Sequence, residues 1–173
     1  MKMFKRFAAA LLVGVMALAM LTACGERTSK IGKEFEDKYV AALNTIRGEG
    51  AEALKNDEAL REKALDRLYY VKGDGTIAKE NVTVTTVLEG SESDPVKIQY
   101  VMVLSKNDDG VYKATEVTAE ALKNINSTMS GSNAQNAQKV AKAIQKFGVA
   151  TKVVNGKTYA AVAMEVDASA LKS

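Results

Sequence analysis

The chain has 173 residues, of which 26% are charged and 47% hydrophobic, with a formal net charge of +3 and no histidine. Because it also has only one cysteine, a Ser-His or Cys-His nucleophilic centre and the usual His/Cys zinc site are excluded. The common glycine-rich phosphate-binding loops do not occur in the sequence either.

The first 23 residues have the order of a secretory signal peptide. Lys2, Lys5 and Arg6 form a basic start, and an uncharged apolar stretch follows over residues 7–20. This stretch is shorter than the ~20 apolar residues that a helix needs to cross a bilayer. A signal peptide is therefore favoured over an uncleaved transmembrane anchor. A second alternative is a signal peptide with ordinary cleavage that leaves Cys24 unmodified, and the cysteine itself weighs against it.

The only cysteine, Cys24, follows Leu21, Thr22 and Ala23 directly after the apolar stretch. This run resembles the lipobox of bacterial lipoproteins. The resemblance implies that the Cys24 sulfur carries a diacylglyceryl group, that the chain is cut before Cys24, and that the new amino end is often acylated. It predicts a protein anchored by lipid in the cell membrane, facing the extracytoplasmic side. A lone thiol fits this prediction because free thiols are rare in exported proteins.

Removal of residues 1–23 changes the charge of the protein. Loss of three basic residues leaves 21 basic side chains against 21 acidic ones, so the mature chain is formally neutral and a nucleic-acid partner is not expected. Residues 24–30 predict a short membrane tether, which reaches only ~20 Å when extended. Residues 31–173 are long enough for a single globular domain.

Two amphipathic helices are predicted after the tether. Apolar residues recur at spacings of three and four from Ile31 to Ile46, and Ser29 and Gly48 are suitable ends, which places a helix at about 30–47. A second helix is predicted from Leu54 to Val71.

The apolar period changes to two at residue 81. Strands are predicted at 82–88, 96–104 and 111–117, with a hairpin turn at Asn107-Asp108-Asp109-Gly110 before the third. The middle of the strand at 96–104 is apolar on both sides, so we expect it to be central in a sheet and covered on both faces.

The last part of the chain predicts a short helix at 118–126 and an internal boundary or mobile loop at 126–132. A helix that Gly148 ends is then predicted over 137–147. Two final strands at 149–154 and 157–166 flank Asn155-Gly156, a strong two-residue hairpin pattern.

The predicted order is α-α-β-β-β-α-β-β. Because the strands form hairpins, we expect an α+β fold with an antiparallel sheet of about five strands and helices packed on one face. Residues 110–117 are similar to the last strand of the cone-shaped domains of the nuclear transport factor 2 type, although a helix and a second hairpin follow here. Small lipoproteins with an α-α-β-β-β core offer a second comparison at the level of the fold.

No catalytic, metal or cofactor site is predicted. The turn at 107–110 lacks the spacing and the distal glutamate of a calcium loop, so a solvated turn is favoured. Aromatic and methionine side chains could line a ligand pocket between helices and sheet, although such residues more often fill a core. The candidates for this pocket are Tyr70, Tyr100, Met102, Tyr112 and Tyr159.

These observations favour a membrane-anchored, non-enzymatic binding or interaction module of the cell envelope. Its partners would be the membrane, through the lipid at Cys24, and an envelope protein or a small ligand. One alternative is a lipid-anchored carrier that holds a small ligand in the aromatic pocket. The other is a hydrolase that uses carboxylates, which would require two buried carboxyl groups in one cleft.

Overall fold

The computed structural model describes residues 30–129 and 134–171. The helices are α2 Lys30–Arg47, α3 Glu58–Leu68, α4 Lys79–Val82, α5 Ala119–Met129, α6 Ala134–Ala143 and the short 3-10 helix η1 Ser169–Leu171. The strands are β1 Thr83–Gly90, β2 Pro95–Val103, β3 Ser105–Asp108, β4 Val111–Ala114, β5 Ile144–Val154 and β6 Lys157–Asp167. The signal peptide, Cys24 and all of the tether except Lys30 lie outside the described residues.

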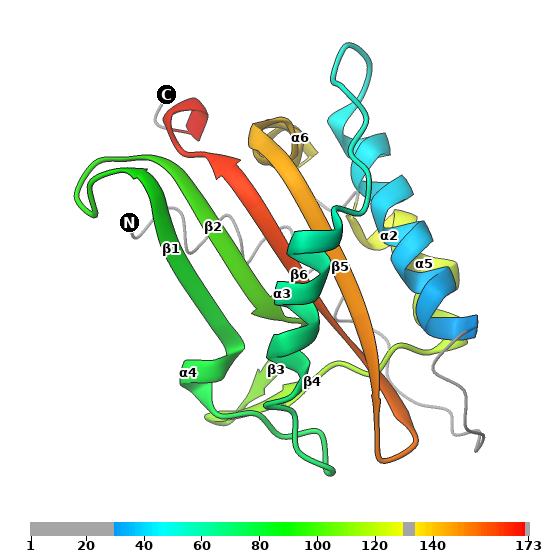
Figure 1. The fold of residues 1–173 in the computed structure, drawn as a ribbon. Coiled ribbons are helices and arrows are strands. Elements are labelled where there is room, and N and C mark those ends of the chain that lie inside the picture. Colours follow the sequence, from blue (N-terminus) through cyan, green and yellow to red (C-terminus); the bar gives the residue numbers. More distant parts are fainter. Residues whose placement is uncertain (1–29, 130–133, 172–173) are drawn as a thin grey trace.

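A four-stranded antiparallel sheet with the order β1-β2-β6-β5 forms the centre of the fold (Figure 1). Strand β2 pairs with β1 and β6, and β5 pairs with β6 through the predicted turn at Asn155 and Gly156, which both adopt positive φ. The α+β class and the antiparallel sheet predicted from the sequence are confirmed. None of the described helices is long and apolar enough to span a membrane.

The sheet is covered on both faces, because β2 and β6 carry apolar residues on both sides. One core contains Phe35 and Leu43 of α2, with Ile98, Tyr100, Val162 and Met164 of the sheet and residues of α5. The other core contains Leu60, Ala64 and Leu68 of α3, with Val101, Val103, Ala161 and Ala163. Alternate residues of one strand point to opposite faces. The prediction of helices on one face is therefore wrong: α3 packs on the face opposite α2 and α5.

The predicted helix at 137–147 is wrong at its end. Helix α6 ends at Ala143, and β5 begins at Ile144. The ladder between β5 and β6 skips Gln145, which forms a bulge. The bulge places Ile144 and Phe147 in the same core, so that two strand residues three apart share one face as they would in a helix. Gly148 lies inside β5 and does not end a helix.

Two further segments differ from expectation. The predicted third strand, 111–117, is shorter, because β4 ends at Ala114 and forms a separate two-stranded sheet with β3. Beyond that sheet only isolated bridges occur, from Lys113 to Thr76 and from Glu116 to Tyr159 of β6. Strand β4 therefore lies outside the four-stranded sheet, and the predicted fifth strand of that sheet is absent from the described residues. Helix α5 continues to Met129, so residues 126–129 of the predicted loop are helical, while residues 130–133 lie outside the described residues.

Candidate functional site

The five residues predicted to line an aromatic pocket do not meet in one cavity. Tyr100 and Met102 belong to the core beside α2, whereas Tyr112 and Tyr159 belong to the core beside α3, on the other face of the sheet. Tyr70 lies at the surface with 51% of its area exposed. Four of these side chains therefore contribute to the two cores, and the ring of Tyr70 is exposed. This arrangement weakens the alternative of a carrier that holds a small ligand in an aromatic pocket.

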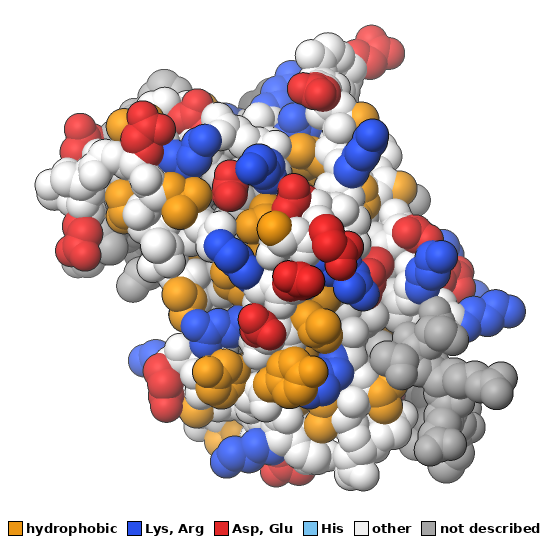
Figure 2. Space-filling model, in the orientation of Figure 1, with side chains coloured by type: hydrophobic (Ala, Val, Ile, Leu, Met, Phe, Trp, Pro, Cys, Tyr) orange, Lys and Arg blue, Asp and Glu red, His pale blue; other side chains and the backbone are white. Residues whose placement is uncertain are grey.

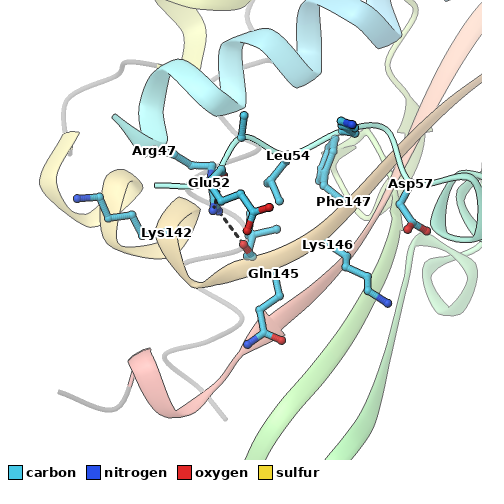
Figure 3. Close-up of a pocket in the computed structure, with 11 residues that line it drawn as sticks. Arg47, Glu52, Leu54, Asp57, Lys142, Gln145, Lys146 and Phe147 are labelled. Carbon is cyan, nitrogen blue, oxygen red and sulfur yellow. Dashed lines mark hydrogen bonds between the residues drawn. The ribbon is translucent and has the colours of Figure 1, made fainter. Parts of the chain in front are cut away.

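A half-open pocket of about 530 Å³ lies at the C-terminal end of α2 (Figure 3). Its walls are Arg47 at the end of α2, the segment 52–55 with Asp57, and Lys142 with residues 144–147 at the junction of α6 and β5. The sequence does not indicate this site, because its three walls are far apart in the chain and form no motif.

Asn44 and Gly48 explain how the chain forms the first wall. Gly48 has φ +72, a left-handed conformation in which glycine commonly ends a helix, so the chain can turn away from α2. The side chain of Asn44 then holds Leu54 by both of its backbone groups: Oδ1 accepts from the N–H at 2.8 Å, and Nδ2 donates to the carbonyl at 2.9 Å. The segment is thereby fixed against the helix.

Arg47 joins the first wall to the second. The residue is only 7% exposed, and its guanidinium donates to the carbonyls of Ala141 and Ile144 on one side and of Glu52 on the other. The carbonyl of Ala141 belongs to the last turn of α6, where a cation is favoured by the helix dipole. Burial lowers the pKa of Arg47, and the nearby Glu52 opposes this change. Nε of Arg47 is buried without a hydrogen-bond partner.

The charged side chains around the pocket are mainly basic. Arg47, Lys55, Lys142 and Lys146 are its cations, and Glu52 and Asp57 are its anions. Asp57 is partly used within the fold, since its carboxylate accepts from the N–H of Leu60 and caps α3. Lys146 forms an outward ion pair of 3.7 Å with Glu165. Lys55 and Lys142 are both exposed, so the pocket can offer positive charge to a ligand.

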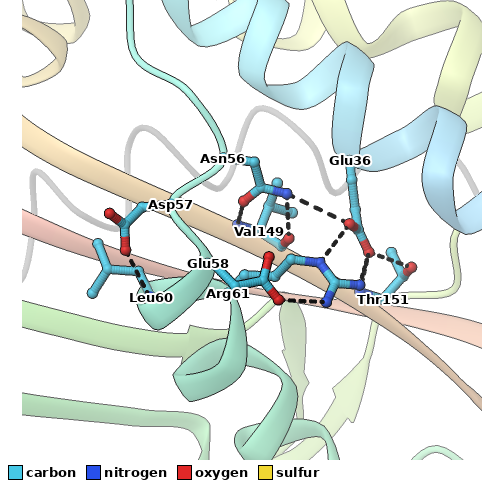
Figure 4. A network of polar contacts seen from close by, with 8 residues as sticks. All are labelled: Glu36, Asn56, Asp57, Glu58, Leu60, Arg61, Val149 and Thr151. Atoms are coloured by element: carbon cyan, nitrogen blue, oxygen red, sulfur yellow. Dashed lines mark hydrogen bonds and ion pairs between the residues drawn. The ribbon is translucent and has the colours of Figure 1, made fainter.

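A polar network lies next to this pocket along the outer edge of β5 (Figure 4). Asn56 bonds Val149 in the manner of a neighbouring strand: Oδ1 accepts from its N–H at 2.8 Å and Nδ2 donates to its carbonyl at 3.0 Å. Glu36 of α2 accepts from the N–H and the hydroxyl of Thr151, each at 2.9 Å. Side chains thus form hydrogen bonds with backbone groups of the edge strand β5, which would otherwise be open to pairing with another strand.

Glu36 is the only carboxylate among the buried polar residues of the described chain. It binds Arg61 of α3 at 2.9 Å, and this hydrogen bond is the largest of the influences that raise the pKa of Arg61. All of its contacts therefore hold the fold together. The two buried carboxyls that a carboxylate hydrolase would need are not found within the described residues.

The acidic turn at 107–110 is built as a hairpin turn. Oδ1 of Asn107 accepts from the N–H of Gly110, and Asp109 and Gly110 adopt positive φ. Asn107, Asp108 and Asp109 are exposed. No group of three or more candidate metal ligands occurs in the part of the chain that the structure describes.

No protein-family model, curated protein or solved structure matches the chain.

Proposed function

We propose that this protein is a lipid-anchored lipoprotein of the extracytoplasmic membrane face that acts as a non-enzymatic binding module of the cell envelope. The lipobox-like run at Cys24 supports the anchor. The observation that carries the binding role is the position of the pocket. It lies at Arg47, the C-terminal end of α2, whereas the tether joins the N-terminal end at Lys30.

Helix α2 separates the anchor from the pocket. It has 18 residues, which corresponds to a length of about 27 Å at 1.5 Å per residue. With the tether on the membrane side, the mouth of the pocket is held away from the bilayer, where a ligand or a segment of an envelope protein can reach it. Its four cations against two anions favour a group that carries carboxylate or phosphate.

Native mass spectrometry tests this proposal on protein extracted from the membranes of its host. The pocket variant is Lys55→Glu with Lys142→Glu, which reverses the charge of the two exposed lysines that the pocket can offer to a ligand. The control is Lys106→Glu with Lys113→Glu, which makes the same charge change on β3 and β4, outside the pocket. We expect an anionic small molecule or a bound protein on the wild type and on the control, and its loss from the pocket variant.

Three outcomes would contradict the proposal. If all three proteins are bare, the pocket is not a binding site under these conditions of isolation. If the bound species is the same in the pocket variant, binding occurs elsewhere. A bound small molecule that is converted to a product during incubation of the wild type would replace the binding module by an enzyme.

A further inference from the structure

Two exposed tyrosines at the C-terminal end of α3 are not used by either core. Tyr69 and Tyr70 follow the last residue of α3 and expose 67% and 51% of their area. Each is associated with a cation: Nζ of Lys152 lies 3.2 Å from the ring centroid of Tyr69, and the guanidinium carbon of Arg67 lies 5.3 Å from that of Tyr70. We call these four residues, with exposed Lys72, the aromatic-basic face.

The aromatic-basic face lies at the end of the molecule where the tether joins. The first turn of α2 packs on β5 so closely that a Cβ at Gly32 would overlap Thr151. The next residue of β5 is Lys152, which lies against Tyr69. The N-terminal end of α2, the hairpin of β5 and β6, and the C-terminal end of α3 are therefore neighbours, as Figure 1 also shows.

The surface has the composition of a protein region that contacts lipid headgroups. Figure 2 shows hydrophobic side chains beside basic ones over the C-terminal end of α3. Tyrosine combines an apolar ring with a polar hydroxyl and is enriched at the level of lipid headgroups. Lysine and arginine are attracted to anionic lipids. Exposed Lys30 and Lys33 of α2 add positive charge at this end.

The acidic groups at this end are fewer. Asp66 precedes Arg67 in α3, and Asp74 lies in the turn after Lys72. The carboxylate of Asp74 is held within its own turn, since it accepts from the N–H and the hydroxyl of Thr76 at 2.9 and 2.7 Å. Glu34 of α2 is exposed as well, and it pairs with Lys38. Against these three carboxylates stand Lys30, Lys33, Arg67, Lys72 and Lys152, so the net charge of this end is positive although the mature chain is formally neutral.

We propose that the aromatic-basic face lies against the anionic headgroups of the membrane that holds Cys24. This inference rests on the lipid anchor of the proposed function. Residues 24–29 reach only ~20 Å when extended, and a short tether gives a roughly millimolar effective concentration of the face at the bilayer. Even a weak contact would then be populated, and it would orient the pocket away from the lipid.

Tryptophan fluorescence tests this contact. The chain contains no tryptophan, so all tryptophan emission comes from the one residue that is introduced. The full chain is produced in a bacterium that processes lipoproteins, with Tyr69→Trp as the only tryptophan. A matched control carries Leu88→Trp at an exposed apolar position of β1, near the β1–β2 turn at the opposite end. Each protein is reconstituted at low density into phosphatidylcholine vesicles with or without phosphatidylglycerol, and bromine on the acyl chains quenches a nearby tryptophan.

We expect a loss of emission at position 69 in brominated vesicles that contain phosphatidylglycerol, and little loss at position 88. Arg67→Glu with Lys152→Glu, in the Tyr69→Trp chain, should reduce the quenching. Equal quenching at both positions, or none at position 69 in protein that floats with the vesicles, would overturn the proposal. The proposal would also be overturned if the emission at position 69 changed with the number of protein molecules per vesicle but not with bromination. That result would indicate that a second copy of the chain covers the face.

The same samples separate the anchor from the contact. The intact mass of each protein shows whether Cys24 is acylated. An unmodified Cys24 would overturn the proposed anchor. Brominated vesicles that contain phosphatidylglycerol are then added to that protein: quenching at position 69 would still support the contact, and its absence would overturn it.

Discussion

Arg61 of α3 and Glu36 of α2 face each other around the outer edge of β5, with Nε 2.9 Å from Oε2. The two helices pack on opposite faces of the sheet, so this ion pair connects the two cores. The same carboxylate accepts two hydrogen bonds from Thr151 of β5. One buried side chain therefore holds a helix on each face to the edge strand between them.

Replacement of Glu36 by glutamine should destabilise the fold. It removes the negative charge, and the new amide group cannot accept the hydrogen bonds that one carboxylate oxygen now receives. We expect a loss of about 1–3 kcal/mol in the free energy of unfolding, nearer the lower value because Arg61 is partly exposed. Urea unfolding measures the change.

Glu34→Gln is the control for that variant. Glu34 lies on the same helix and pairs with Lys38 at 3.0 Å, but both side chains are about half exposed, whereas the side chain of Glu36 is only 9% exposed. The expected change is within about 0.5 kcal/mol. Similar losses for the two variants would show that the Glu36 network is no more important than a surface pair.

Gly148→Ala should also destabilise the protein. A Cβ at this position of β5 would overlap the backbone of Leu60 and Arg61, so α3 would have to move away from the sheet. Overpacking of this kind costs about 1–3 kcal/mol. Gly73→Ala is the matched control, because its Cβ would meet only Asn155 at 3.9 Å. A Gly148→Ala protein with unchanged thermal stability would contradict the close packing of α3 on β5.

The stability of the protein should fall at alkaline pH because buried tyrosines ionise on unfolding. Burial raises the pKa of Tyr100 to about 12, against a partial opposing effect of its hydrogen bond with Thr85, and it raises the pKa of Tyr39 as well. The fold favours the neutral phenol of Tyr100. The stability linked to Tyr100 is fully present below about pH 10 and is lost as the pH rises through about 12.

Tyr100→Phe removes one of these titrations. Urea unfolding between pH 9 and 11 should show a decline that is shallower than in the wild type by up to ~1.4 kcal/mol per pH unit. An identical decline in both proteins would mean that Tyr100 ionises as readily in the folded state as in the unfolded one.

The regular elements could be predicted from the sequence because local patterns determine them. The helix expected at 30–47 agrees with α2 at Lys30–Arg47, and the Asn155-Gly156 turn joins β5 to β6. The end of α6 could not be predicted, because the bulge at Gln145 gives Ile144 and Phe147 a helical spacing within a strand. The role of Gly148 depends on α3, which is distant in the sequence.

The pocket could not be predicted for a similar reason. In the sequence, Arg47 is an ordinary basic residue at the end of a predicted helix. It is buried because α2 packs against α6. The prediction of an aromatic pocket rests on residue type alone, and the alternation of side chains along the strands places Tyr100 and Tyr159 on opposite faces of the sheet. Residue types indicated which side chains could bind a ligand, but not which of them share a cavity.

The lipid anchor at Cys24 is the central claim, and the intact mass of the mature protein in a lipoprotein-processing bacterium tests it most directly. We predict that the wild type occurs in the membrane fraction, begins at Cys24 and carries the added mass of two or three acyl chains, whereas Cys24→Ser lacks this mass and leaves the membrane or stays uncleaved. A wild-type protein with an unmodified thiol, or a Cys24→Ser protein with the same mass shift and membrane fraction as the wild type, would contradict the claim.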